Sequence, residues 1–78
     1  MTFEGKKIVC GARSAIKALR AGRAEKIFLA RDASESVTGP VRESAEEKSV
    51  PVDGTHSMRE LGKAASIEIG AAAVTVLK

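Results

Sequence analysis

The chain has 78 residues, a formal net charge of +3 and a pI near 9.4. This length predicts a single domain over residues 1–78, and its core must be small and mainly aliphatic because the only aromatic residues are Phe3 and Phe28. So small a domain cannot enclose a large substrate pocket without losing much of the burial that stabilises it. We therefore expect a protein that is not an enzyme.

The charge is distributed unevenly along the chain. Residues 1–31 hold eight basic and two acidic side chains, whereas residues 32–56 hold two basic and six acidic ones. A basic and an acidic pole on one small domain favour a polyanionic partner such as nucleic acid. The alternative is a charged surface of the kind that many small proteins carry.

Cysteine content and hydropathy indicate the setting. Cys10 is the only cysteine, which excludes an internal disulfide, and its apolar neighbours predict a buried, unreactive thiol. The first residues lack the apolar stretch of a signal peptide, and the longest apolar run, 70–77, is too short to cross a bilayer. We expect a cytoplasmic protein with no membrane partner, and we expect it to be a monomer.

The first half of the chain alternates between strand and helix patterns. A β-branched run over 7–10 predicts a strand that stops at Gly11. A helical pattern begins there, continues to about Ala21 and ends at Gly22. The continuous apolar run within 26–31 predicts a second strand, covered on both faces.

The second half continues this alternation. After a polar turn over 33–36, a helical pattern ends near residue 48, but Gly39 and Pro40 interrupt it, so this helix either starts near Thr38 or bends there. A short strand over 50–53, a helix from 57 to about 65 and a strand over 71–77 follow. Ser57 and Glu60 have the spacing of a capping box at the start of that helix.

This order of elements predicts the fold class. Strands separated by helices are typical of crossover connections and of a covered, partly parallel sheet. We expect an α/β fold: a single-domain, three-layer α-β-α sandwich with a mixed four-stranded sheet.

Catalytic and metal-binding patterns are lacking in the sequence. His56 is the only histidine, has no cysteine at metal-ligand spacing and is expected to be a water-exposed turn residue. The acids Glu43, Glu46 and Glu47 are expected to form a solvated helix face rather than a catalytic pair. No phosphate-binding loop, dinucleotide fingerprint or nucleophile elbow occurs. No cofactor, metal or catalytic residue is predicted, and a small hydrolase acting on nucleic acid lacks any catalytic pair.

The first predicted helix is the most informative element. Its apolar residues fall on one face, and Arg13, Lys17 and Arg20 fall within an arc of about 60° beside that face, at 100° per residue. The helix N-terminus follows Gly11, where free amides and a partial positive charge suit phosphate or a base edge. Arg13 on the first turn is the candidate for reading guanine. Without Trp or Tyr, recognition by stacking is not expected.

Two stretches carry a resemblance to a known family. Residues 11–22, with the sequence GARSAIKALRAG, and residues 61–74, with the sequence LGKAASIEIGAAAV, resemble the L7Ae/L30e family of kink-turn RNA-binding ribosomal proteins, and in particular its bacterial YbxF-like members. The resemblance covers about residues 7–78. The sequence departs from the family in having Ser66 where a glycine is usual, and in reducing the helix before the first strand to at most a turn.

The resemblance implies binding of RNA kink-turns, sharply bent loops with sheared G·A pairs and a flipped-out base. Gly11 would allow close approach, Arg13 and Ser14 would meet the guanines or nearby backbone, and Lys17 would hold phosphate. The loop 66–69 would cover the flipped-out base. The candidate RNA-binding residues are Gly11, Arg13, Ser14, Lys17, Arg20, Arg31, Ser66, Ile67, Glu68 and Ile69.

Two functions are therefore carried forward. The first is a non-enzymatic protein that binds kink-turns in ribosomal RNA or in a regulatory RNA element. The alternative is a small protein-interaction or regulatory module that uses its acidic and basic poles to contact a protein partner.

Overall fold

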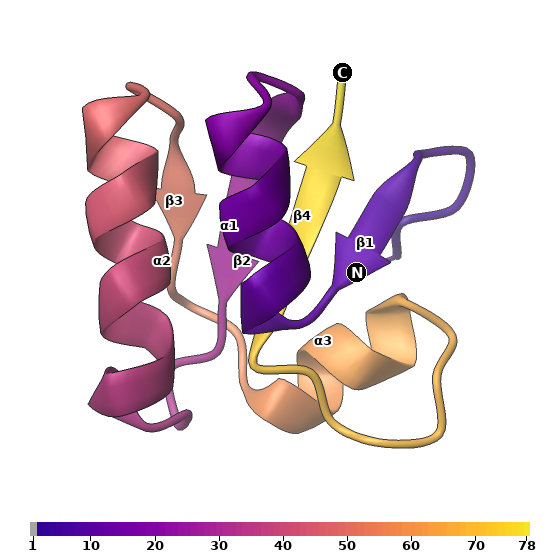
Figure 1. The fold of residues 1–78 in the computed structure, drawn as a ribbon. Helices are drawn as coiled ribbons and strands as arrows, with labels where there is room; N and C mark the ends of the chain where they lie inside the picture. Colours follow the sequence, from indigo (N-terminus) through magenta and orange to yellow (C-terminus); the bar gives the residue numbers. More distant parts are fainter. Residues whose placement is uncertain (1) are drawn as a thin grey trace.

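Four strands and three helices alternate along residues 2–78, the part of the chain that this computed structural model describes (Figure 1). The order and type of all seven elements agree with the sequence prediction. Their bounds are β1 Ile8–Cys10, α1 Ala12–Arg20, β2 Ala24–Leu29, α2 Glu35–Glu47, β3 Val52–Asp53, α3 Met58–Ala64 and β4 Ala73–Leu77.

The last strand is an inner strand of the sheet. The strands lie in the order β1-β4-β2-β3, with β4 antiparallel to both β1 and β2, and with β2 parallel to β3. Ile8 pairs with Val76 across β1 and β4, and Phe28 pairs with Val74 across β2 and β4. The sheet is mixed, as predicted, and only the β2-α2-β3 connection joins adjacent parallel strands.

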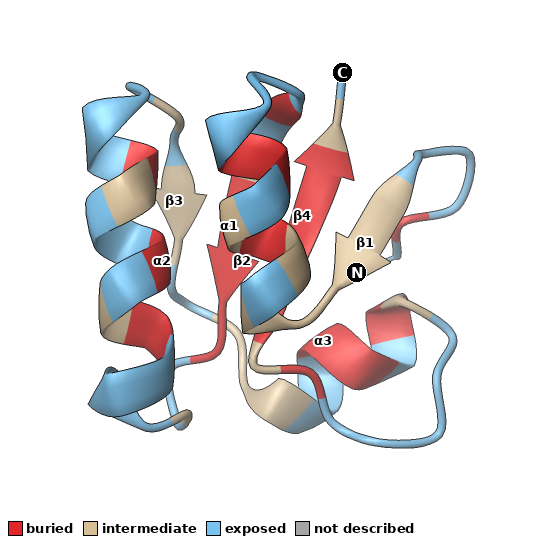
Figure 2. Cartoon of the chain, in the orientation of Figure 1, coloured by how far each residue is buried: buried red, intermediate tan, exposed pale blue. Residues whose placement is uncertain are grey.

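Helices cover both faces of the sheet. Alternate β4 residues point to opposite faces, so Ala73 packs in a core with α1 and α2 whereas Val74 and Val76 pack in a second core with Leu61 of α3. Figure 2 shows that β2 and β4 are the most buried strands, in keeping with their inner positions. This is the predicted three-layer α-β-α sandwich.

The second core also contains the start of the described chain. Residues 4 and 5 form a turn ahead of β1, in place of a helix. Phe3 is buried, its amide donates to the carbonyl of Ala64 at 3.3 Å, and its ring meets the ring of Phe28 edge-on with centroids 5.0 Å apart. This turn therefore closes the α3 side of the sheet. Among residues 2–78, no helix is long and apolar enough to cross a membrane.

The start of α2 differs from the prediction. Ser34 caps the helix, with its hydroxyl accepting from the Ser36 amide at 3.3 Å, so α2 begins at Glu35 and residues 35 and 36 belong to the helix rather than to a turn. Pro40 lies inside the helix. A start near Thr38 is therefore wrong, because a good N-cap outweighs the one intrahelical hydrogen bond that proline removes.

All three helices end in the same way. After α1, the amides of Gly22 and Arg23 donate to the carbonyls of Leu19 and Ala18 at 3.1 and 2.9 Å, which is a Schellman motif. Ser49 and Ser66 take the place of Gly22 after α2 and α3, with φ of 56° and 61° against 70° for the glycine. The two serines are the only non-glycine residues with positive φ in residues 2–78.

Candidate nucleic-acid interface

The N-terminus of α1 is open to the outside. Gly11 has φ of 100° and ψ of 153°, a conformation that favours glycine, and a Cβ built there would meet nothing within 4 Å. The first turn has no side-chain cap and no acidic residue. Its leading amides lack partners within the helix and carry a partial positive charge. This end of α1 can therefore approach an anion or an electron-rich base edge.

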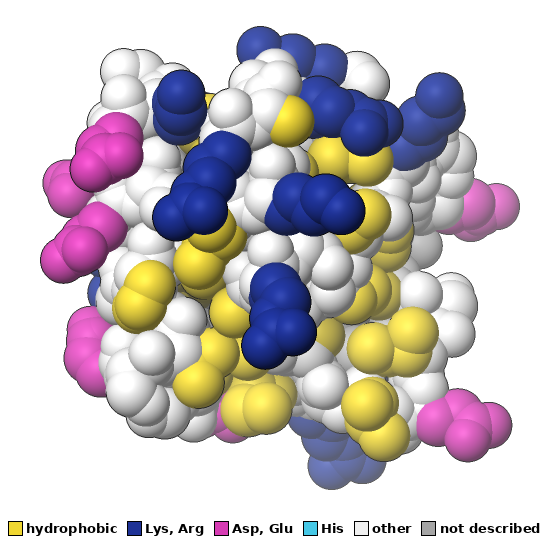
Figure 3. All heavy atoms as spheres, in the orientation of Figure 1, with side chains coloured by type: hydrophobic (Ala, Val, Ile, Leu, Met, Phe, Trp, Pro, Cys, Tyr) yellow, Lys and Arg dark blue, Asp and Glu magenta, His cyan; other side chains and the backbone are white. Residues whose placement is uncertain are grey.

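A row of cations runs along α1 from this open end. Arg13, Lys17 and Arg20 are exposed and flank a shallow hollow whose apolar lining comes from Ile16 and Ala21. Figure 3 shows basic side chains spread over α1 and toward the end of the sheet above it, and acidic ones gathered over α2 at the left. The predicted basic and acidic poles are thus separate surfaces of the folded protein.

The segment after α3 presents apolar side chains to solvent. Ile67 and Ile69 are 36% and 75% exposed, and they are two of the three large hydrophobic residues exposed within residues 2–78. Figure 3 shows apolar side chains on the lower right of the same face, where Figure 1 places this segment. An exposed apolar loop is a suitable surface for a base that has left its stack.

Backbone packing holds this loop on α3. The Ile67 amide donates to the Gly62 carbonyl at 3.0 Å, and the amide of Ala71 donates to the Met58 carbonyl at 3.0 Å. A Cβ at Gly62 would collide with the backbone carbonyl of Ile69, and one at Gly70 would lie 3.2 Å from the Met58 Cβ. The absence of a side chain at Gly62 therefore fixes how closely the loop can lie against α3.

The open helix end and the apolar loop are neighbours. The Gly11 amide donates to the Ala73 carbonyl at 2.8 Å, and the Ala30 amide donates to the Ala72 carbonyl at 2.9 Å. The chain that leaves the loop thus passes directly beside the start of α1. We call residues 11–14 together with residues 66–70 the helix–loop edge.

The predicted site residues separate into three places. Gly11, Arg13 and Ser14 lie in the helix–loop edge with the whole of loop 66–69. Lys17 lies one turn farther along α1, and Arg20 lies at its other end. Arg31 follows β2 at the end of the sheet where the edge lies, but its side chain is engaged by α3 and the segment before it.

Arg31 is part of a hydrogen-bonded network at the start of α3. Its Nη1 donates to the Thr55 carbonyl at 2.7 Å and to Oε1 of Glu60 at 3.0 Å. Glu60 also completes the predicted capping box with Ser57, accepting from the Ser57 amide at 3.0 Å. These hydrogen bonds, first from the Ser57 backbone and then from Arg31, lower the pKa of Glu60 to about 2. The carboxylate therefore anchors the helix that carries the loop.

Sequence reasoning missed the residues that shape the surroundings of the loop. Arg59 and Lys63, four apart on α3, are exposed and line a hollow together with Ile67 and Ile69. Their spacing could have indicated one helix face. The close packing of Gly62 against Ile69 has no local signal in the sequence, because it depends on how the loop returns to the helix.

Other candidates for chemistry have little support. His56 is half-buried rather than water-exposed, with Nδ1 3.7 Å from Oε2 of Glu60. Cys10 is half-buried, and its burial raises the thiol pKa, which disfavours the reactive thiolate. Glu43, Glu46 and Glu47 are exposed, as predicted. Residues 2–78 contain no group of three or more potential metal ligands.

Comparison with known proteins identifies the family. The model of the ribosomal protein L7Ae/L30e/S12e/Gadd45 family matches residues 2–78. The chain belongs to this family. Members with similar sequences include the RNA-binding protein YbxF of Geobacillus stearothermophilus, 43% identical over 72 residues that cover 92% of this chain and 88% of that protein. An RNA-binding protein of Bacillus pumilus is 38% identical over 74 residues, covering 95% and 90% of the two chains.

The fold comparison agrees with this membership. The structure of the 15.5 kDa RNA-binding protein of Giardia lamblia superposes with a TM-score of 0.86 at 28% identity, covering 91% of this chain and 60% of that one. The resemblance in residues 11–22 and 61–74 is therefore confirmed as family membership, and the predicted fold class is confirmed with it.

Proposed function

We propose that this protein binds structured RNA, without catalysis, and that its targets are kink-turns. The observation that carries the proposal is the helix–loop edge, where an uncapped helix N-terminus with no acidic residue lies beside an exposed apolar loop. Family membership and the RNA-binding names of similar proteins support RNA as the partner.

Each part of the edge matches one feature of a kink-turn. The open backbone at Gly11 lets the helix enter a widened groove, and the Arg13 guanidinium can donate two hydrogen bonds to a guanine edge. Lys17 lies one turn farther along α1 and would contact a phosphate. Ile67 and Ile69 offer an apolar cover for the extruded base. In this arrangement the guanines and the extruded base meet different segments that lie side by side.

Arg31 has a supporting role in this proposal. Its hydrogen bonds to Thr55 and Glu60 hold the start of α3, and α3 carries the loop. An effect of Arg31 on RNA binding would then arise through the position of the loop.

The test is a titration of the protein onto a kink-turn RNA and onto the same RNA with its sheared G·A pairs replaced by Watson-Crick pairs, at one fixed salt concentration. We expect strong preference for the kinked RNA. Equal, weak binding to both would reject kink-turn recognition, and capture of a protein partner in place of RNA would favour the interaction module.

Two variants test the assignment of residues. Arg13→Ala should weaken binding to the kinked RNA by about 1–3 kcal/mol and reduce the preference for it, because it removes a base contact. Lys17→Ala should weaken binding to both RNAs and lower the log-log salt slope by about one, because it removes a phosphate contact. Unchanged affinity in both variants would reject this site.

A further inference from the structure

A second feature of α1 runs along its side, from the helix–loop edge toward the end remote from the loop. A groove of about 300 Å³ runs between α1 and the strands β1 and β4. Its lining combines apolar side chains at the base with polar and basic ones at the sides, namely Val9, Ala18, Ala21 and Leu77 with Ser14, Lys17 and Arg23. We call this the cationic groove.

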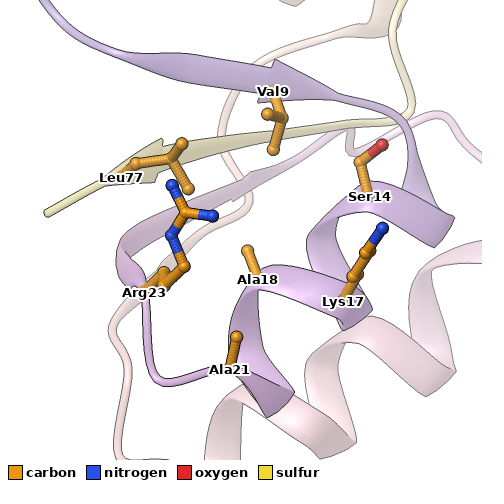
Figure 4. Close-up of a pocket in the computed structure, with 7 residues that line it drawn as sticks. All are labelled: Val9, Ser14, Lys17, Ala18, Ala21, Arg23 and Leu77. Atoms are coloured by element: carbon orange, nitrogen blue, oxygen red, sulfur yellow. The ribbon is translucent and has the colours of Figure 1, made fainter.

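Two cations point into this groove from different segments. Figure 4 shows the Arg23 guanidinium beside Leu77, and the Lys17 ammonium on the side of the groove nearer Ser14. Arg23 follows the Schellman motif of α1, where its amide is fixed by the Ala18 carbonyl at 2.9 Å. The fold thus holds Arg23 at the rim of the groove, at the end of α1 where Arg20 also lies.

The sheet brings a further cation to the same end. The Leu77 amide donates to the Lys7 carbonyl at 2.9 Å, which places Lys7 beside the C-terminal end of β4. Lys7 is exposed, and strand alternation puts it on the face of the sheet that Val9 and the groove occupy. The ion pairs found within residues 2–78 use Arg31, Arg42 and His56, so Lys7, Lys17, Arg20 and Arg23 keep their charge available.

The position of the groove relates it to the helix–loop edge. Ser14 and Lys17 line the groove and lie within or next to that edge, whereas Arg23 lies beyond the far end of α1. The nine residues of α1 rise about 13 Å, which corresponds to about four to five base pairs of an A-form RNA duplex. A strand that leaves the edge along α1 would reach Arg23 after about that length.

We propose that the cationic groove binds the sugar-phosphate backbone of a duplex stem that flanks the RNA bound at the helix–loop edge. This inference rests on the proposed function and extends it, because it makes affinity depend on the length of a stem that the edge itself does not contact. The occupant follows from charge complementarity. Lys17 and Arg23 line the groove, Lys7 and Arg20 lie near its far end, and none of the four takes part in an ion pair found within residues 2–78. A shallow groove with such charges suits a backbone better than a base.

The experiment varies the RNA and the protein together. The RNAs are a kink-turn whose stems have about ten base pairs, and two versions in which one stem or the other is cut to about three. Three pairs rise at most about 10 Å, which falls short of Arg23. The protein variants are Arg23→Glu and, as a control with the same change in net charge, Lys48→Glu. Lys48 is exposed at the end of α2, on the acidic side of the molecule. Arg23→Gln keeps most of the side chain that covers Leu77, and thermal unfolding shows whether each variant is folded.

We expect Arg23→Glu to weaken binding of the long-stem RNA about tenfold and to lower its salt slope by about one. Lys48→Glu should change both the affinity for the long-stem RNA and its salt slope much less. For one of the two shortened RNAs, the wild type and Arg23→Glu should have equal affinity. The stem that is shortened in that RNA is the one that follows the groove. Arg23→Gln should show the same dependence on stem length with a smaller loss.

Two results would overturn the groove assignment: an equal loss with long and short stems, or an equal loss in Lys48→Glu. Failure of the proposed function gives a different result, because wild type would then bind kinked and Watson-Crick RNAs equally. If Arg23→Glu then lost affinity for both of those RNAs, and lost it only when their stems are long, the assignment of the groove as a stem-binding site would still be supported.

Discussion

The two ends of α1 present different kinds of surface. At the N-terminal end, backbone amides and an apolar loop are fixed by glycines and by hydrogen bonds between main-chain atoms. Toward the C-terminal end, exposed basic side chains lie in or near a shallow groove. The surface at the N-terminal end of α1 is thus set mainly by backbone shape, and the surface toward its C-terminal end mainly by positive charge.

This difference separates specificity from affinity. Contacts made by fixed amides and an apolar surface depend on the shape of the RNA, whereas contacts between flexible cations and phosphates are alike for any sequence and are weakened by salt. We therefore expect changes at the helix–loop edge to alter the choice of RNA, and changes near Arg23 to alter affinity and its salt dependence.

The largest effect is expected from Gly62→Ala, which disrupts the helix–loop edge at the N-terminal end of α1 and leaves the cationic groove unchanged. The added methyl group would collide with the Ile69 carbonyl, so the loop must leave α3. We expect a loss of about 1–3 kcal/mol in the free energy of unfolding and a loss of preference for kinked RNA. Denaturant unfolding and the two-RNA titration measure these quantities.

Gly54→Ala is the control for this change, since a Cβ at Gly54 would meet nothing within 4 Å. Equal effects of the two substitutions would mean that packing against Ile69 does not set the loop position.

A smaller effect is expected from Ile67→Glu, which keeps the backbone of the edge and changes only its apolar surface. Because Ile67 is already 36% exposed, stability should hardly change, whereas binding of kinked RNA should weaken about tenfold, or about 1.4 kcal/mol. Val37 on α2 is similarly exposed, at 39%, and Val37→Glu makes the same chemical change away from the edge. A similar loss in both variants would indicate general charge repulsion.

Acid should weaken the support of the helix–loop edge. The pKa of Glu60 is lowered from 4.5 to about 2, so its contribution to stability is complete above pH 4.5 and is lost as the pH falls toward 2. Glu60→Gln should flatten the dependence of unfolding free energy on pH in this window. Asp53, whose pKa is lowered by hydrogen bonds from Thr55, adds to the slope in the same direction, so some slope should remain. An unchanged slope would contradict the role given to Glu60.

The smallest effects concern the two serines that end α2 and α3 with positive φ. Ser49→Gly and Ser66→Gly should each raise the free energy of unfolding by less than about 1 kcal/mol, because glycine adopts this conformation without steric cost but loses more entropy on folding. RNA affinity should stay the same in both. If Ser66→Gly alone weakened RNA binding, the stiffness of the loop would itself contribute to recognition.

Much of the fold could be predicted because its signals are local. The capping box of Ser57 and Glu60, the glycine after α1 and the apolar run of β2 each act over a few residues, and the structure contains all three. The sequence leaves the start of α2 open between two alternatives because two local signals compete there, the Ser34 cap and Pro40 within the helix.

The rest depends on residues far apart in the sequence. Arg31 has the appearance of one more basic RNA ligand, and its partner Glu60 lies 29 residues away. The inner position of β4 and the fit of Gly62 under Ile69 likewise follow from tertiary packing. Gly11 and Arg13 are predicted from the pattern of the first helix, whereas Ser14 and the loop 66–69 come from the family resemblance. The nearness of these residues in space is seen only in the fold.

The inner position of β4 also determines when the proposed RNA interface can assemble during synthesis. β1 pairs only with β4 among the described strands, and the pairing of Ile8 with Val76 joins residues from opposite ends of the chain. Pairing residues so far apart in the sequence costs chain entropy and is slow compared with local contacts. While residues 73–77 are still inside the ribosomal exit tunnel, Gly11 lacks the Ala73 carbonyl that holds it beside the loop. On the proposed function, the helix–loop edge of a nascent chain would therefore stay incomplete until residues 73–77 have emerged.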